Sequence, residues 1–211
     1  MLHAHELSYS YGRGAALVID GWSAEFPEGT TTALTGPSGR GKSTLLYLLG
    51  LMLQPTAGEI LIDGTPVSTV KDATKARLRA DRFGFVFQDA ALDQTRTVID
   101  NVIETALYRG ARRDIAARRG RELLDRFGVD VPADRKPGQV SGGQAQRIAL
   151  CRALLSEPRI LLADEPTGNL DPQTTAVVVD ALQEHAATGA AVIIVTHSPE
   201  VAEACDRRIE L

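Results

Sequence analysis

The chain has 211 residues, of which 44% are hydrophobic and 24% are charged, and its formal net charge is −4. These values are typical of one soluble globular domain with a subdomain, and the slightly acidic balance excludes a general electrostatic attraction to nucleic acid. No apolar run approaches the ~20 residues that span a bilayer, and residues 1–6 lack the basic and apolar regions of a signal peptide, so we expect a cytoplasmic protein. The two cysteines, Cys151 and Cys205, have no metal-ligand spacing and are expected to be reduced and unpaired.

Apolar and β-branched runs alternate with helical patterns along the chain, which predicts an α/β fold. We expect strands over residues 6–11, 15–26, 30–35, 58–63, 84–87, 160–163 and 190–196. A turn at Gly12 and Gly14 separates the first two, and an apolar helical pattern covers residues 45–53. The last two runs are nearly continuously apolar, as in strands of a parallel sheet that helices cover on both faces.

Between residues 89 and 138 the pattern becomes helical and rich in arginine, with the best helix candidates at 98–108 and 115–127. This change indicates a helical insertion in an α/β core. We therefore predict a single domain over residues 1–211. Its core covers about 1–87 and 156–211, and a helical subdomain covers about 88–155.

The most specific motif is a glycine-rich loop that fits the pattern G-x-x-x-x-G-K-[ST], with Thr44 directly after it. Its members are Gly36, Pro37, Ser38, Gly39, Arg40, Gly41, Lys42 and Ser43. Glycines let the backbone approach an anion, and both the loop N–H groups and the positive end of the following helix point at it. We expect Lys42 to reach the β- and γ-phosphates of a nucleotide and the Ser43 hydroxyl to bind Mg²⁺. A chance glycine turn would not explain the strand before the loop and the helix after it.

A second glycine motif, Ser141-Gly142-Gly143-Gln144, follows the helical region. Ser141 and Gln144 have the spacing of a capping box, and an apolar helix continues from them until Pro158 stops it. A helix start alone does not account for two glycines, since each costs about 1 kcal/mol in a helix. They predict that the backbone comes close to another group, and an exposed helix N-terminus is a second anion site.

The apolar run at 160–163 leads directly into Asp164 and Glu165. In a P-loop protein, carboxylates at the end of a buried strand lie beside the phosphate site. Asp164 is expected to hold Mg²⁺ through a water, and Glu165 to orient or deprotonate the attacking water as general base. The alternative is a solvated acidic turn.

In this order the motifs resemble the nucleotide-binding domain of ATP-binding cassette (ABC) proteins, over essentially the whole chain. The loop at 36–43 resembles Walker A, and residues 140–144 resemble the signature motif, with Val140 in place of leucine. The other matches are Gln88 in the Q-loop, Asp164 in Walker B, Glu165 as catalytic glutamate, Asn169-Leu170-Asp171 as D-loop, His197 as switch histidine and Tyr11 as the aromatic that stacks on adenine. The resemblance implies a P-loop core with a mainly parallel sheet, an N-terminal antiparallel β subdomain and an inserted helical subdomain.

The resemblance also implies what the site holds. ATP and Mg²⁺ are the expected cofactors, with Ser43, Gln88 and Asp164 at the metal and Lys42, Gln88, Glu165 and His197 in catalysis. The expected nucleotide contacts are Tyr11, residues 36–44, Ser141, Gly142, Gly143, Gln144 and Asp171. Tyr9 is a rival to Tyr11. The remaining histidines, His3, His5 and His185, are interpreted as surface residues, and Trp22, Cys151 and Cys205 as packing residues.

The family mechanism implies a partner for this chain. Two nucleotide-binding subunits, expected to be two copies of the chain, enclose ATP between one Walker A loop and the other signature motif. Together they drive a separate transmembrane permease from the inner face of the membrane, without nucleic acid. A chromosome-organising ATPase would need a long coiled coil, and a ribosome-associated factor would carry two cassettes.

The branch of the family is indicated by two segments. Residues 165–171 resemble the macrolide-exporter, lipoprotein-releasing and cell-division ATPases, while residues 88–98 are closer to peptide or bacteriocin exporters. We expect export or mechanotransmission acting on a peptide, lipoprotein or drug, and the alternative is a signalling role without transport. The basic stretch Arg112, Arg113, Arg118, Arg119 and Arg121 is typical of a solvated helix face, with contact to a permease or lipid headgroups as the alternative.

Overall fold

Two sheets organise the computed structural model, which describes residues 1–12 and 14–211. The first sheet is antiparallel, with the order β2-β1-β4-β5, and the second is parallel, with the order β6-β7-β8-β3-β9. In chain order the strands are β1 Leu2–Tyr9, β2 Ile19–Phe26, β3 Thr30–Thr35, β4 Ala57–Ile62, β5 Thr65–Pro66, β6 Phe83–Val86, β7 Ile160–Asp164, β8 Ala191–Val195 and β9 Arg207–Glu210. Both the parallel core sheet and the N-terminal antiparallel sheet of the predicted fold class are therefore confirmed.

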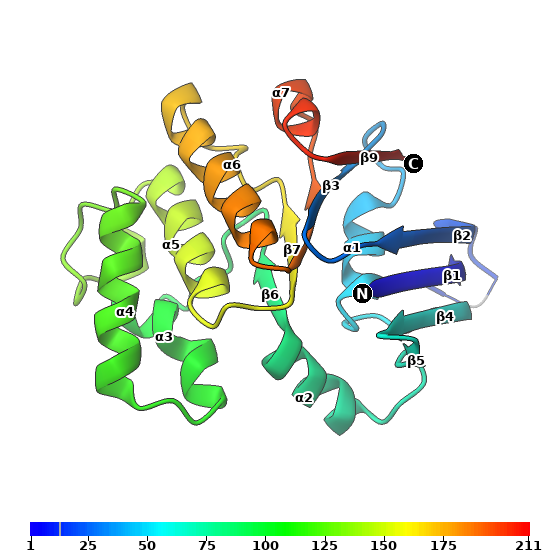
Figure 1. The fold of residues 1–211 in the computed structure, drawn as a ribbon, viewed down its shortest axis with the longest axis horizontal. Coiled ribbons are helices and arrows are strands. Elements are labelled where there is room, and N and C mark those ends of the chain that lie inside the picture. Colours follow the sequence, from blue (N-terminus) through cyan, green and yellow to red (C-terminus); the bar gives the residue numbers. More distant parts are fainter. Residues whose placement is uncertain (13) are drawn as a thin grey trace.

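Helices surround the parallel sheet. Their bounds are α1 Lys42–Leu49, α2 Asp72–Arg82, α3 Val98–Tyr108, α4 Arg113–Arg126, α5 Gly142–Leu154, α6 Pro172–Ala187 and α7 Pro199–Glu203, with a 3₁₀ turn at Pro137–Gln139. In Figure 1, α3, α4 and α5 lie together on one side of the parallel strands, and the antiparallel sheet lies on the opposite side. The subdomain boundaries near residues 88 and 155 stay a prediction.

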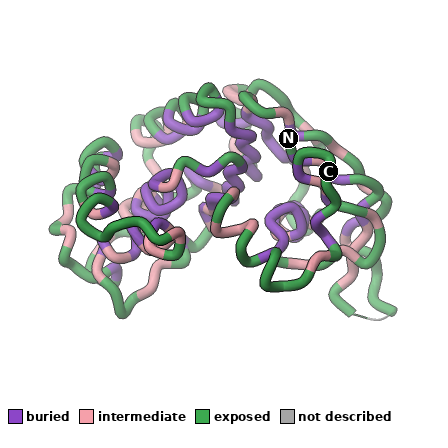
Figure 2. The backbone as a smooth tube through the Cα atoms, turned by 60° about the horizontal axis from the view of Figure 1, so that its bottom comes forward, coloured by how far each residue is buried: buried purple, intermediate pink, exposed green. Residues whose placement is uncertain are grey.

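Successive side chains of the central strands point to opposite faces of the sheet, and the core is therefore divided into two hydrophobic clusters. In β7, Leu161 and Ala163 pack with α3, α5 and α6, while Ile160 and Leu162 pack with α1 and the antiparallel sheet. Successive side chains of a strand point to opposite faces, so a continuous apolar run fills both clusters. Figure 2 shows the buried backbone concentrated inside the molecule, with exposed segments around it.

Several helix and strand boundaries differ from those predicted from the pattern of apolar and polar residues. Strand β1 begins four residues earlier than expected, and residues 15–18 precede β2 instead of belonging to it. The apolar pattern at 45–53 extends beyond α1, which ends at Leu49 with Gly50 as its C-cap; Leu51 then takes a positive φ of 57°. Helices α2, α6 and α7 and strands β5 and β9 were not predicted.

His185 corrects one prediction, because it is buried rather than on the surface. It lies on α6, where Nε2 is 2.8 Å from the carbonyl oxygen of Pro158 just before β7. Burial lowers the pKa of His185, and the Pro158 carbonyl partly opposes that shift. A polar residue can therefore occupy this interior position because the preceding loop supplies its hydrogen-bond partner.

The expected packing residues lie as predicted. Cys151 is buried and Cys205 is partly buried, and both are free thiols among the described residues. Burial raises the pKa of both thiols. Trp22 is half-buried, with its ring 6.3 Å from that of Phe26. Within the described residues, no helix is long and apolar enough to cross a membrane.

Candidate nucleotide-binding site

The glycine-rich loop connects the end of β3 to the start of α1. Gly36, Gly39 and Gly41 have φ angles of 138°, 79° and 87°, a region that L side chains rarely adopt. Space is also restricted: a Cβ on Gly36 would lie 2.6 Å from the Leu211 carbonyl oxygen, and one on Gly41 would lie 2.8 Å from a Val18 methyl. Both glycines are therefore required by backbone conformation and by their neighbours.

Lys42, the first residue of α1, is folded back over this loop. Its side chain is only 5% exposed, and Nζ donates hydrogen bonds to the carbonyl oxygens of Gly36 and Pro37, both at 2.9 Å. Within residues 1–12 and 14–211, no side chain caps the start of α1, so its first N–H groups are free to bind an anion. An ammonium and a helix N-terminus thus converge on one place.

Two carboxyl groups lie beside the loop because β7, β8 and β3 run parallel and end at the same edge. Asp164 is the last residue of β7 and is 2% exposed. Glu165 follows with a φ of 47°, and its N–H donates to the Val195 carbonyl oxygen of β8 at 2.9 Å. This left-handed turn directs the Glu165 side chain into the site. Strained residues of this kind cluster at functional positions.

His197 faces Glu165 from the end of β8. Its Nε2 lies 3.7 Å from Oε1 of Glu165, beyond a direct hydrogen bond, and that oxygen is buried with no hydrogen-bond partner among the described residues. Burial raises the pKa of Glu165, the His197 charge opposes the rise, and the Asp164 carboxylate adds to it. A carboxylate with a raised pKa and a buried oxygen that has no partner in the described part of the chain is chemically able to accept a proton.

These groups line one pocket of about 460 Å³. Its lining residues are Tyr11, Val18, Ser38, Gly39, Gly41, Lys42, Ser43, Thr44, Gln88, Asp164, Glu165, Val195 and His197. The tyrosine at this pocket is Tyr11, which is 66% exposed and whose hydroxyl is 2.8 Å from Oγ1 of Thr44. Tyr9 instead packs against the core cluster beneath. The apolar Val18 and Val195 are lining residues that sequence reasoning missed, because nothing in their local pattern distinguishes them from core.

The signature residues and the D-loop lie outside this pocket. Ser141 and Gln144 form a capping box at the start of α5: Ser141 N–H donates to Oε1 of Gln144 at 2.8 Å, and Gln144 N–H donates to Oγ of Ser141 at 3.2 Å. Asp171 caps α6 through the N–H and hydroxyl of Thr174, and these bonds lower its pKa. The chain therefore does not bring its own signature to its own P-loop.

The two signature glycines differ in their surroundings. A Cβ on Gly143 would lie 3.0 Å from the Asn169 carbonyl oxygen, so this glycine lets α5 pack on the D-loop. A Cβ on Gly142 would meet nothing within 4 Å. The close approach predicted for the motif is therefore, at Gly143, an approach to the D-loop of the same chain. At Gly142 the surface at the start of α5 is open.

Asp164 supports a prediction on pH-dependent stability. Burial raises its pKa, and Ser43, Lys42 and His197 oppose the rise. Since the folded pKa lies above the unfolded one, ionised Asp164 costs stability at neutral pH, and this cost disappears as pH falls through the raised pKa. Asp164→Asn should therefore raise the Tm of the nucleotide-free protein at pH 7 by about 2–4 °C, as ~1 kcal/mol does in a chain of this size. Calorimetry between pH 4 and 8 should show this gain shrinking toward acid pH.

The control for that experiment is Asp180→Asn, an exposed carboxylate on α6. It should show no gain that depends on pH. A nucleotide-free Asp164→Asn protein that is less stable than the parent at pH 7 would contradict the interpretation of Asp164 as a carboxylate that burial disfavours.

A phosphate loop between a buried strand and a helix, with two carboxylates at the end of the neighbouring strand, defines a P-loop nucleoside triphosphatase. The sequence profile of the ABC transporter family matches residues 19–168. The chain belongs to that family and is the ATP-binding and ATP-hydrolysing subunit of an ABC transporter.

Several known proteins are similar to this chain over all or nearly all of its length. The lipoprotein-releasing system ATP-binding protein LolD of Nitrobacter hamburgensis is 41% identical over 211 residues, 100% of this chain and 91% of the relative. The macrolide export ATP-binding/permease protein MacB 1/2 of Paracoccus denitrificans is 39% identical over 96% of this chain but only 30% of the relative. A dimeric structure of MJ0796, described as a bacterial ABC transporter cassette, has a TM-score of 0.93 and 34% identity over 100% of this chain and 94% of its own.

Proposed function

We propose that this chain binds MgATP in the pocket around Lys42, hydrolyses it with Glu165, and transmits the resulting motion to a membrane permease. One observation carries the proposal: the loop lysine, both carboxylates and His197 line a single pocket, while the signature motif lies outside it. Support also comes from the family and from the similarity to MJ0796 in a post-hydrolysis state bound to ADP and Pi, which has a TM-score of 0.92 and 33% sequence identity. The individual residue roles remain predictions of this proposal.

The donor set fits a magnesium ion. The Ser43 hydroxyl and the Asp164 carboxylate are hard oxygen donors in the pocket, and Asp164 is buried where its ionised form is disfavoured without a cation. Gln88 also lines the pocket and would contribute its amide oxygen. When bound, Mg²⁺ would neutralise phosphate charge.

The chain's own residues would bind the phosphates, accept the proton of the attacking water and stack on the base. Lys42 binds the phosphates by exchanging the carbonyl oxygens of Gly36 and Pro37 for phosphate oxygens. Glu165 accepts a proton from the attacking water through its unused Oε1, and His197 holds the terminal phosphate beside it. Tyr11 offers an exposed ring for stacking on the base.

A second copy of the chain would complete the site. The signature helix start, with open space at Gly142, is suited to cap a phosphate but lies outside the P-loop pocket of its own chain. Solved structures of the similar MJ0796 cassette are described as dimeric. We propose that two copies close on two ATP molecules and separate after hydrolysis.

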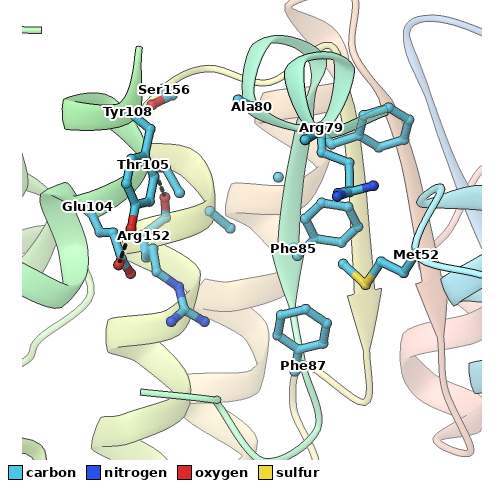
Figure 3. Close-up of a pocket in the computed structure, with 14 residues that line it drawn as sticks. Met52, Arg79, Ala80, Phe85, Phe87, Glu104, Thr105, Tyr108, Arg152 and Ser156 are labelled. Atoms are coloured by element: carbon cyan, nitrogen blue, oxygen red, sulfur yellow. Dashed lines mark hydrogen bonds between the residues drawn. The ribbon is translucent and has the colours of Figure 1, made fainter. Parts of the chain in front are cut away.

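The permease contact is proposed for a separate groove of about 360 Å³. Figure 3 shows its aromatic wall, where Phe85 and Phe87 stack with ring centroids 5.8 Å apart and Met52 lies beside them. The facing wall is α3, where the Tyr108 hydroxyl donates to Glu104 at 3.0 Å. An apolar floor with polar rims fits a short amphipathic helix of a permease.

Met52→Glu tests this groove. Met52 is 38% exposed in the groove and is not part of the nucleotide pocket, so the charge should leave ATP affinity within about twofold. It should lower the fraction of the chain recovered with permease-containing membranes by at least about tenfold, since a carboxylate would be desolvated on an apolar floor. Val177→Glu, a change at a 42% exposed residue of α6, is the control and should stay membrane-bound. Equal recovery of both variants would contradict the groove as the docking site.

For the cargo, we propose export or release of lipid-modified or amphipathic molecules from a membrane. The support is the similarity to LolD and MacB proteins over 96–100% of this chain. The chain would act at the inner face of the membrane, bound there through the permease. ATPase assays of the chain reconstituted with its permease, in the presence of a lipopeptide or of a macrolide, would test this: stimulation by neither would favour a signalling role.

A further inference from the structure

Two consecutive alanines beside the nucleotide pocket have an unfavourable backbone conformation. Ala90 and Ala91, two and three residues after Gln88, have φ angles of 60° and 44°. Residues with a Cβ seldom adopt this left-handed region, and each such residue costs about 1–2 kcal/mol. Such a turn persists only where its surroundings hold it, so the contacts that hold it also determine where Gln88 lies.

Arg152 provides those contacts. It lies near the end of α5 and is 8% exposed. Its Nη1 donates to the Ala91 carbonyl oxygen at 2.7 Å and its Nη2 donates to the Ala90 carbonyl oxygen at 2.8 Å. The rigid guanidinium fork thus binds both carbonyls of the strained turn at once, a geometry that the single ammonium of lysine cannot reproduce.

A second residue of α5 holds the other side of Gln88. Gln146 is buried, and its Nε2 donates to the Phe87 carbonyl oxygen at 3.3 Å. Side chains of helix α5 therefore hydrogen-bond to the backbone on both sides of Gln88, at Phe87 and at Ala90–Ala91. The same helix begins at the Ser141 capping box.

We propose that Arg152 is a positioning residue that fixes Gln88 in the nucleotide pocket and ties it to the helix that carries the signature motif. The consequence is that Gln88 and residues 141–144 move as one unit. Arg152 also lines the groove assigned to the permease, so a permease helix seated there would touch the side chain that holds Gln88 (Figure 3). This inference rests on the proposed function of Gln88 at the metal.

The test compares Arg152→Met, Arg152→Lys, Gln88→Ala and the Gln88→Ala/Arg152→Met double variant in the full chain. Arg152→Met should leave ATP affinity within about twofold, because the P-loop is untouched, and should lower the single-turnover hydrolysis rate by about tenfold or more through misplacement of Gln88. Amide hydrogen exchange over residues 88–97 should accelerate. In the Gln88→Ala background, loss of Arg152 should lower the rate by less than about twofold further, because the two residues act in series.

Arg109→Met is the matched control. Arg109 also donates to two backbone carbonyl oxygens, those of Ala80 and Ser156, but neither belongs to the turn after Gln88 and neither lines the nucleotide pocket. Its loss should lower Tm without changing turnover or exchange over residues 88–97. If Arg152→Met does not fold, Arg152→Lys carries the test, with a smaller change in the same two quantities.

Two results would overturn the proposal. One is independent action, in which the Gln88 and Arg152 effects multiply in the double variant. The other is unchanged exchange over residues 88–97 in a folded Arg152 variant. Failure of the proposed function of Gln88 is separable, since it would appear as an undiminished single-turnover hydrolysis rate in Gln88→Ala alone.

Discussion

Replacement of Glu165 by glutamine is expected to lower ATP turnover by at least about 100-fold, since general base catalysis contributes about 10²–10⁴-fold. Glutamine keeps the size of the side chain but cannot accept the proton of the attacking water. Oε1 of this carboxylate is buried, has no hydrogen-bond partner in the part of the chain that the structure describes, and lies 3.7 Å from Nε2 of His197. ATP binding should persist, because Lys42 and the loop amides are unchanged. Phosphate release under single-turnover conditions measures the loss, and calorimetry measures the binding.

The same variant should accumulate as an ATP-bound dimer. If ATP joins two chains and hydrolysis separates them, a chain that binds but does not hydrolyse stays closed. Analytical ultracentrifugation with and without ATP would detect the change in mass. Glu200→Gln, an exposed residue at the start of α7, serves as the control and should turn over normally. An ATP-saturated Glu165→Gln chain that remains monomeric at every concentration would refute the two-chain site.

Lys42→Ala is expected to raise the Kd for ATP by about 10–100-fold. A hydrogen bond to a charged group contributes about 1.5–3 kcal/mol, and each 1.4 kcal/mol is a factor of ten. Lys42 has no acidic partner within hydrogen-bond reach in the described residues; its bonds go to two loop carbonyls, which leaves its charge available to phosphate. Titration calorimetry with ATP measures the change.

The control for Lys42 is Lys71→Ala, which removes an exposed lysine at the start of α2. Its affinity should match that of the parent chain. Unchanged ATP binding in Lys42→Ala would remove the P-loop assignment and, with it, the proposed roles of Ser43 and Asp164.

Local chemistry made part of this protein predictable from sequence. Positive φ at Gly36 and Gly41 follows from residue type, and the capping box of Ser141 and Gln144 follows from spacing over one helical turn. The continuous apolar run of β7 predicted a strand that is buried on both faces. Each of these properties depends on residues that are neighbours along the chain, so sequence pattern contains them.

Other features required the tertiary structure, because they depend on residues far apart in sequence. Burial of His185 is possible only because Pro158, 27 residues away, offers a carbonyl at 2.8 Å. Gly143 is small because the D-loop passes over it. The strained turn after Gln88 is held by an arginine 61 and 62 residues further on, in what reads as an ordinary amphipathic helix. The sequence by itself determined the phosphate-binding loop, the nucleotide that it binds and the family to which the chain belongs. Only the fold decided which helix holds Gln88, since that depends on backbone carbonyls whose positions no side-chain pattern encodes.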